Sequence, residues 1–239
     1  MITTLQDFIS QFRKVKELGW ITTHRSGPTG IGKTLEDLLG IDENNFDLPD
    51  FGETELKSFR IDTNSLLTLF TKSPLPAGVN TEIKNKFGYI DPKRPGRKII
   101  HATLSATRFS PIRDSGVMLK IDTSVPNEIA FISNTGWRGA YYPKKRIEES
   151  ISNKLDARLV YVKAEARGSD AKEQFHFVEA YALEKFNFES FTNLLERGKI
   201  LVDIRIGQYP DGRTHDHGTG FRIHHEDVPF LFEKHTRLV

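Results

Sequence analysis

Asp50, Glu55 and Lys57 stand close together in the stretch PDFGETELKSF. If residues 54–59 form a strand, side chains two positions apart share a face, so Glu55 and Lys57 point one way and Leu56 points into the core. Asp50 ends the preceding loop, from which its carboxylate can reach Glu55. The spacing therefore predicts two carboxylates and one ammonium group at a single place on a sheet.

Such a cluster has the chemistry of a metal-dependent phosphodiesterase. Two close carboxylates bind a hard divalent cation such as Mg²⁺ through oxygen. The cation polarises a phosphodiester oxygen and lowers the pKa of a bound water, while Lys57 holds that water or the scissile phosphate. The pattern Asp…Glu-x-Lys is a nuclease signature, although so short an acidic pattern also matches solvated loops by chance.

Two other acidic residues lie near this cluster in the sequence. Glu36 is predicted on a helix that starts near Thr34, from which it can add a carboxylate to the same site. The alternative for Glu36 is a first-turn acid that the helix dipole stabilises. Glu53 shares the face of Glu55 on an ideal strand, but it lies at a turn and is expected to be solvated.

The segment Gly27–Thr34 reads GPTGIGKT and satisfies the phosphate-loop pattern G-x-x-x-x-G-K-[ST]. In a nucleotide-binding protein, its amides and Lys33 would bind phosphates. The context argues against this role, because the preceding apolar stretch is short and the chain lacks regularly alternating strand and helix units. The favoured interpretation is a glycine-rich turn into the helix that carries Glu36, with nucleotide binding as the alternative.

A strand is predicted at ILVDIRIG (200–207), where apolar residues alternate with Asp203 and Arg205. These two polar residues either form a surface ion pair or contact DNA. An arginine can donate two hydrogen bonds to guanine, and an acid can accept one from cytosine.

A glycine-flanked loop with four polar candidates follows this strand: His215, Asp216, His217 and Arg222. The His-x-His pair could ligate a metal, but no third ligand is obvious. Recognition of bases or phosphates fits these side chains better.

Residues 73–98 are loop-rich and basic, with Lys84, Lys86, Lys93 and Arg94 among the cations. The segment is either a solvated surface loop or an arm that follows the phosphates of a nucleic acid.

The whole chain is predicted to fold as a mixed α/β protein. Its 239 residues are 37% hydrophobic and 28% charged, as in an ordinary folded protein, and the absence of cysteine excludes disulfide scaffolds and thiol nucleophiles. The net charge of +2 does not by itself indicate a nucleic-acid binder. Helices are predicted at residues 5–18, 34–39, 142–155, 188–198 and 228–235, and strands at 54–59, 65–72, 99–105, 117–122, 128–133, 159–166, 175–183 and 200–207. The first two strands are predicted to form a hairpin, and residues 41–50 an acidic loop.

No signal peptide is recognisable in the charged, amphipathic first 20 residues, so we expect a cytoplasmic protein.

Several longer motifs, in order along the chain, resemble those of the MvaI/BcnI family of type II restriction endonucleases. They are TGIGKTLEDLL, NNFDLPDFGETELKS, SLLTLFTKSP, VDIRIG and THDHGTGFRI. The resemblance is strong over residues 1–90 and 200–239 and looser over 95–160. This family is itself similar to the MutH mismatch-repair nicking enzyme.

The resemblance implies a restriction-endonuclease-like PD-(D/E)xK core with Glu36, Asp50, Glu55 and Lys57 as the active site. Asp50 and Glu55, aided by the Leu56 carbonyl, would hold Mg²⁺, for which Mn²⁺ can substitute. The resemblance also implies a monomer that binds double-stranded DNA and cleaves one strand per binding event. Its catalytic lobe is expected at residues 1–160 and its DNA-recognition lobe at 161–239.

The DNA contacts follow from the same resemblance. The target would be CC-x-GG, and MvaI-like members, which this chain resembles most, take A or T in the middle, so we expect CCWGG. A cognate DNA methyltransferase is the expected genetic partner. The residues expected to bind DNA are Asp203, Arg205, His215, Asp216, His217, Arg222, Lys84, Lys86, Lys93 and Arg94.

Three other functions remain as alternatives. They are a MutH-like nicking enzyme that needs a partner protein, a nucleotide-binding ATPase that uses GPTGIGKT, and a DNA-binding module without catalysis.

Overall fold

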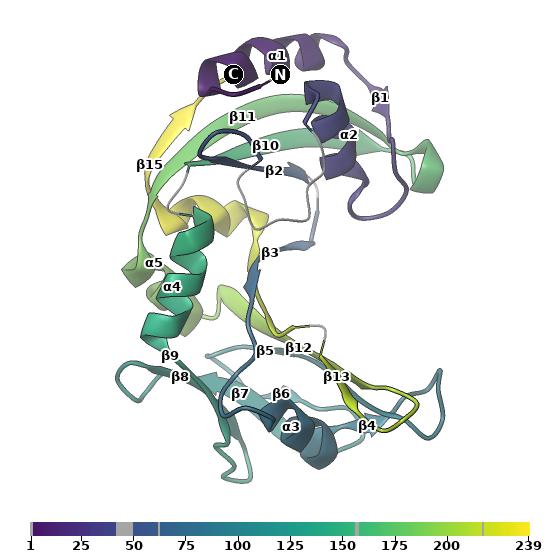
Figure 1. Ribbon diagram of the computed structural model, residues 1–239, viewed down its shortest axis with the longest axis vertical. Coiled ribbons are helices and arrows are strands. Elements are labelled where there is room, and N and C mark those ends of the chain that lie inside the picture. Colours follow the sequence, from purple (N-terminus) through teal and green to yellow (C-terminus); the bar gives the residue numbers. More distant parts are fainter. Residues whose placement is uncertain (1, 42–49, 62, 156–157, 217) are drawn as a thin grey trace. The chain divides into compact units, whose positions relative to one another are not determined.

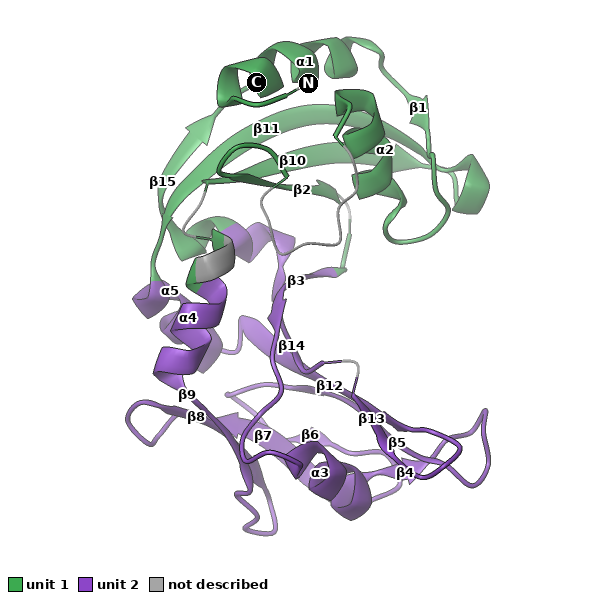
Figure 2. Cartoon of the chain, viewed as in Figure 1, with its two compact units in different colours: residues 1–65, 152–187, 229–239 green, residues 66–151, 188–228 purple. Residues whose placement is uncertain are grey.

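The computed structural model describes residues 2–41, 50–61, 63–155, 158–216 and 218–239. The predicted acidic loop lies almost wholly outside these residues. The chain divides into two compact units (Figure 2). Unit 1 contains residues 1–65, 152–187 and 229–239, and unit 2 contains residues 66–151 and 188–228. The chain therefore passes between the units several times, whereas the sequence prediction placed one boundary near residue 160.

Unit 1 is built on a five-stranded mixed sheet (Figure 1). Its order is β1 (Ile21–Thr22), β11 (Gln174–Phe186), β10 (Arg158–Arg167) and β2 (Thr54–Arg60), with β15 (Phe232–Arg237) also paired to β11. β2 runs parallel to β10, and the other pairs are antiparallel. The mixed sheet confirms the predicted α/β class, and β2 is an edge strand of the described sheet.

Two helices pack on this sheet. α1 (Leu5–Glu17) begins with a capping box between Thr4 and Asp7 and buries Phe8 and Phe12. α2 (Gly30–Leu39) ends at Gly40, whose φ of 67° allows the left-handed turn that terminates a helix. The apolar faces of both helices share one hydrophobic core with Leu56 of β2 and with residues of β10 and β11. This shared core fixes α2 beside β2.

Unit 2 contains two antiparallel sheets among its described residues. The first has the order β3 (Leu66–Thr71), β14 (Gly220–His224), β12 (Ile200–Gln208), β5 (Lys98–Leu104) and β4 (Tyr89–Ile90), with β13 (Thr214–Asp216) paired to β12. The second has the order β6 (Ser110–Pro111), β7 (Met118–Asp122), β8 (Glu128–Ser133) and β9 (Ala140–Pro143). The helices are α3 (Val79–Phe87), α5 (Phe188–Glu196) and α4 (Lys144–Leu155), the last of which ends in unit 1.

Three predictions about local structure were wrong. The predicted hairpin does not form, because β2 pairs with β10 and β3 pairs with β14 in another sheet. The basic segment 73–98 contains α3, whose buried Val79, Ile83 and Phe87 recur every four residues among the charges. The tail is a short 3₁₀ helix (His225–Leu231) followed by β15, whose largely exposed side chains give no strand alternation.

None of the described helices is long and apolar enough to cross a membrane.

Candidate active site and nucleic-acid interface

The alternation of β2 separates its core residue from its polar ones, as predicted. Leu56 is 5% exposed and lies in the core of unit 1. Glu55 and Lys57 are half-buried on the other face, and Lys57 Nζ lies 2.5 Å from Glu55 Oε1. Glu53, by contrast, is exposed. β2 therefore presents one carboxylate and one ammonium group side by side.

Asp50 is held next to this pair by the backbone. The Leu56 amide donates a 2.7 Å hydrogen bond to Asp50 Oδ2. Burial raises the pKa of the Asp50 carboxyl, the negative charge of Glu55 raises it further, and the hydrogen bond from Leu56 and the charge of Lys57 oppose these effects. The structure thus brings Asp50, Glu55 and Lys57 together.

The direction of the Leu56 peptide groups follows from the register of β2. The carbonyl of Glu53 accepts from the Arg158 amide of β10, so odd-numbered residues of β2 turn their backbone groups toward β10. The amide of Leu56 points the opposite way, to Asp50. Because the N–H and C=O of one strand residue point to the same side, the Leu56 carbonyl also faces the open edge beside Asp50.

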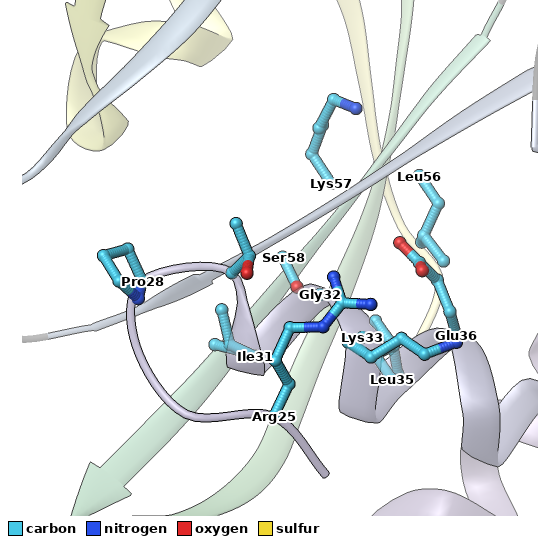
Figure 3. A pocket seen from close by; sticks show the side chains of 11 residues that line it. Arg25, Pro28, Ile31, Gly32, Lys33, Leu35, Glu36, Leu56, Lys57 and Ser58 are labelled. Atoms are coloured by element: carbon cyan, nitrogen blue, oxygen red, sulfur yellow. The ribbon is translucent and has the colours of Figure 1, made fainter. Parts of the chain in front are cut away.

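Glu36 enters from α2 and lines a cavity of about 280 Å³ together with Leu56 and Lys57 (Figure 3). α2 begins at Gly30, so Glu36 lies in its second turn and the explanation as a first-turn acid does not apply. The cavity is lined by Arg25, Pro28, Thr29, Ile31, Gly32, Lys33, Leu35, Glu36, Leu56, Lys57 and Ser58. Glu36 therefore lies near β2, in the cavity where the strand contributes Leu56, Lys57 and Ser58.

The phosphate-loop motif does not form a phosphate loop. Its last residues lie within α2, where the Lys33 amide bonds to the Thr29 carbonyl. Lys33 Nζ is 2.8 Å from Asp37, and the Thr34 hydroxyl donates to the Gly30 carbonyl at 2.8 Å and accepts from the His24 amide at 2.9 Å. These groups serve the packing of α2, which supports the interpretation as a turn into the helix.

In unit 2, the predicted recognition residues Asp203 and Arg205 lie on β12, and Arg222 lies on β14. Asp203 is 6% exposed, accepts a 2.7 Å hydrogen bond from the Thr103 hydroxyl, and also accepts from Arg222 Nη1. Arg222 Nη2 donates to the Leu66 carbonyl at 3.1 Å. Asp203 therefore pairs with Arg222 on the next strand, and not with Arg205 on its own strand.

Arg205 and Arg222 share an unusual feature. Among the described atoms, each Nε is buried without a hydrogen-bond partner. A buried N–H without a partner costs free energy of folding, so both arginines are held in these positions at a cost.

The predicted loop around His215 and Asp216 is in fact β13. The ring of His215 lies 4.5 Å from that of Tyr209, which the sequence analysis did not single out. Asp216 accepts hydrogen bonds from Ser73, Asn80 and the Gly218 amide. His217 lies outside the described residues. Tyr209, Thr103 and Asn80 were missed because the fold, and not a sequence motif, brings them to these residues.

The four basic residues of the 73–98 segment that were predicted to bind DNA separate into two groups. Lys86, Lys93 and Arg94 are exposed, as an arm that contacts DNA would require. Lys84 is only 2% exposed and donates a 3.4 Å hydrogen bond to the Gly212 carbonyl. Its prediction as a DNA-binding residue is corrected by its burial, since it lies on the inner face of α3.

The model of the MvaI/BcnI restriction endonuclease family matches residues 9–232 of the chain. The chain belongs to this family. It is similar to the restriction endonuclease MvaI in complex with its cognate DNA substrate, with 33% identity and a TM-score of 0.82 over 100% of both chains. It is also similar to MvaI in the absence of DNA, with 32% identity and a TM-score of 0.65 over 100% of this chain and 99% of that one. A comparison with curated protein sequences found no match.

As a member of the MvaI/BcnI family, the chain is a type II restriction endonuclease, a site-specific DNA endonuclease with the mixed α/β fold of MvaI. The resemblance recognised from its motifs is thereby confirmed.

Restriction endonucleases generally use a divalent metal, and the donors beside β2 suit one. Asp50, Glu55 and the Leu56 carbonyl offer only hard oxygen ligands, which Mg²⁺ and similar cations prefer. The described residues contain no group of three or more His, Cys, Asp and Glu that could hold a metal ion. The cation would therefore rest on two carboxylates and one carbonyl and keep several waters. It would also relieve the mutual repulsion of the two acids.

Proposed function

We propose that the chain is a Mg²⁺-dependent restriction endonuclease that cleaves DNA at CCWGG, acts as a monomer and nicks one strand per binding event. Mn²⁺ is expected to substitute for Mg²⁺. The observation that carries the proposal is the convergence of Asp50, Glu55 and Lys57 at the open edge of β2. Glu36 lies across the adjoining cavity.

In the proposed mechanism, Asp50, Glu55 and the Leu56 carbonyl would hold the cation. When bound, the cation supplies positive charge at the scissile phosphate and acidifies a coordinated water. Lys57 donates a hydrogen bond to the attacking water or to a phosphate oxygen, and Glu55 fixes its ammonium group at 2.5 Å. The Leu56 amide keeps the Asp50 carboxylate directed at the edge of the strand. Glu36, which lines the same cavity, supports the site.

We assign catalysis to unit 1 and DNA recognition to unit 2. The assignment is supported by the location of the acids and Lys57 in unit 1 and of Arg205, Arg222 and the exposed Lys86 in unit 2. An arginine such as Arg205 can donate two hydrogen bonds to guanine. Exposed Lys93 and Arg94 would contact phosphates. His215 and His217 stay proposed DNA contacts.

The CCWGG site is supported by the similarity to MvaI, whose structure contains cognate DNA. Such an enzyme acts in the cytoplasm, beside a DNA methyltransferase that protects the host's own sites and is the proposed genetic partner.

The proposal is tested by digesting a plasmid of known sequence with the purified chain and Mg²⁺, and sequencing the ends. We expect nicked circles before linear DNA, and ends only at CCWGG. Cleavage that requires an added protein would indicate a MutH-like enzyme, and intact plasmid after prolonged incubation would overturn the proposal.

A further inference from the structure

One face of α3 is bonded to the ribbon formed by β12 and β13. Asn80 Nδ2 donates to Asp216 Oδ2 at 2.5 Å, and the hydroxyls of Thr81 and Thr214 lie 2.8 Å apart. One turn further along α3, the buried Lys84 reaches the carbonyl of Gly212. Polar side chains of α3 thus follow β13 and the turn before it, residue by residue.

Asp216 is the centre of these contacts. Its Oδ2 accepts from Asn80 and also from the Ser73 hydroxyl at 2.8 Å, and its Oδ1 accepts from the Gly218 amide at 2.8 Å. Both carboxylate oxygens are therefore engaged inside unit 2. A base contact by Asp216 would have to share or replace these hydrogen bonds, because a carboxylate only accepts.

The charge of Asp216 also acts on a buried tyrosine of unit 2. Tyr142 is fully buried in unit 2, and its hydroxyl donates to the Lys72 carbonyl at 2.8 Å. Burial raises the pKa of Tyr142, and the negative charge of Asp216 raises it further.

The residue next to Asp216 is held on the ribbon as well. His215 is in register with Gly207 of β12, and its ring contacts that of Tyr209. Because β13 has only three residues, side-chain hydrogen bonds at Asp216 and Thr214 are a large part of what fixes it.

We propose that Asp216 is a positioning residue and does not itself contact a base: through Asn80 and Ser73 it fixes β13, and with it His215, for DNA recognition. This inference rests on the proposed assignment of DNA recognition to unit 2. It separates Asp216 from Arg205 and Arg222, which keep unpaired donor atoms.

An exchange of the two partners tests this role. Asp216→Asn replaces one carboxylate oxygen by an NH₂ group, which can only donate. In one orientation of the new amide this group faces the donor of Asn80, and in the other it faces the amide of Gly218. Asn80→Asp alone sets two carboxylates against each other. The double variant Asn80→Asp/Asp216→Asn restores one donor and one acceptor with the same total charge. A positioning residue is rescued by this exchange, whereas a base-reading carboxylate is not.

The measurement is the dissociation constant for a duplex with one CCWGG site, without Mg²⁺, and for duplexes with one base pair changed. Each single variant is expected to weaken cognate binding about ten-fold, the order of one lost buried hydrogen bond. Because the whole ribbon is disturbed, no single base pair should account for the loss. The double variant is expected to bind within about three-fold of the wild type, a smaller change than the loss of one buried hydrogen bond would cause.

The controls isolate the added charge and the fold. Asn85→Asp makes the same charge change at an exposed position of α3 and should weaken binding less than Asn80→Asp. Ser73→Ala removes another donor to Asp216 and should give a smaller loss of the same kind. Thermal unfolding of each variant establishes that it is folded.

Two outcomes overturn the inference: a double variant that binds as weakly as Asp216→Asn, or an Asp216→Asn variant that loses discrimination at one base pair only. If the wild-type chain binds no duplex, the proposed function itself fails. If the wild type binds but the exchange does not rescue, only the role of Asp216 fails.

Discussion

The amide of Leu56 and the carboxylate of Asp50 are joined by a 2.7 Å hydrogen bond that ties the end of a loop to an edge strand. This bond sets Asp50 beside Glu55 although four residues lie between them in the chain. The register of β2 turns the Leu56 carbonyl to the same edge of the strand as Asp50. The carboxylates of Asp50 and Glu55 repel each other, and the charge of Lys57 opposes this repulsion. The repulsion affects the stability of the protein as well as catalysis.

Asp50→Asn is predicted to stabilise the metal-free protein at neutral pH. The pKa of Asp50 is raised above its ordinary value of 3.8, so its ionised form costs stability in the folded state. This cost is fully present above the folded-state pKa and disappears as the pH falls toward 3.8. The gain in melting temperature of the variant should therefore shrink in acid. Mg²⁺ should raise the melting temperature of the wild type but not that of Asp50→Asn. A variant that melts below the wild type at neutral pH would contradict this prediction.

Lys57→Ala is predicted to lower the single-turnover cleavage rate by about a hundredfold or more, because a positioned donor to the reacting phosphate or water is lost. Cognate binding without Mg²⁺ should change only a few-fold. Rapid-quench cleavage and a binding titration on the same duplex separate the two effects. Equal losses in binding and cleavage would instead assign Lys57 to ground-state DNA contacts.

Leu35→Ala is predicted to destabilise the protein by about 2–5 kcal/mol, because Leu35 is fully buried and a cavity would remain beneath the helix that carries Glu36. Leu38→Ala on the same helix serves as the matched control, since Leu38 is only partly buried and should cost less. Urea denaturation gives both values. Similar costs for the two variants would mean that α2 does not pack as described.

Asp203 and Arg222 are predicted to be energetically coupled. Removing either partner leaves a charged group without its hydrogen bonds, and Asp203 is 6% exposed. Asp203→Ala and Arg222→Ala should each destabilise the protein, and the double variant should cost less than the sum by about 0.5–3 kcal/mol. A double-mutant cycle from chemical denaturation measures this coupling. Additive costs would argue that the ion pair is not formed in solution.

The sequence predicted the structure best where the local spacing of apolar residues is also what packs them into the core. The alternation of β2 correctly predicted that Leu56 enters the core and that Glu55 and Lys57 do not, and the helical spacing of Phe8, Phe12 and Val15 correctly predicted α1. The pairing of β2 with β10 was not predictable, because its partner comes about a hundred residues later and parallel strands leave no turn signal between them. The hairpin was predicted in its place.

The candidate recognition residues show the same limit. Asp203 and Asp216 have the right type for base contacts, but their partners Arg222 and Asn80 come from other strands and helices. Lys84 looked like one cation among several in a loop, and its burial follows from the apolar face of α3, which the neighbouring charges obscured. Residue type predicts what a side chain can bind, whereas the fold decides what it does bind.

Glu55 and Glu53 provide the most direct test of the proposed active site. They lie two positions apart, but only Glu55 is half-buried beside Lys57, and Glu53 is exposed. The measurement is single-turnover cleavage of a CCWGG duplex in Mg²⁺ by Glu55→Ala, with Glu53→Ala as the matched control. We predict that Glu55→Ala cleaves at least about a hundredfold more slowly, because a metal ligand is lost, and that Glu53→Ala cleaves like the wild type. Wild-type cleavage by Glu55→Ala, or an equal loss in both variants, would contradict the proposed site.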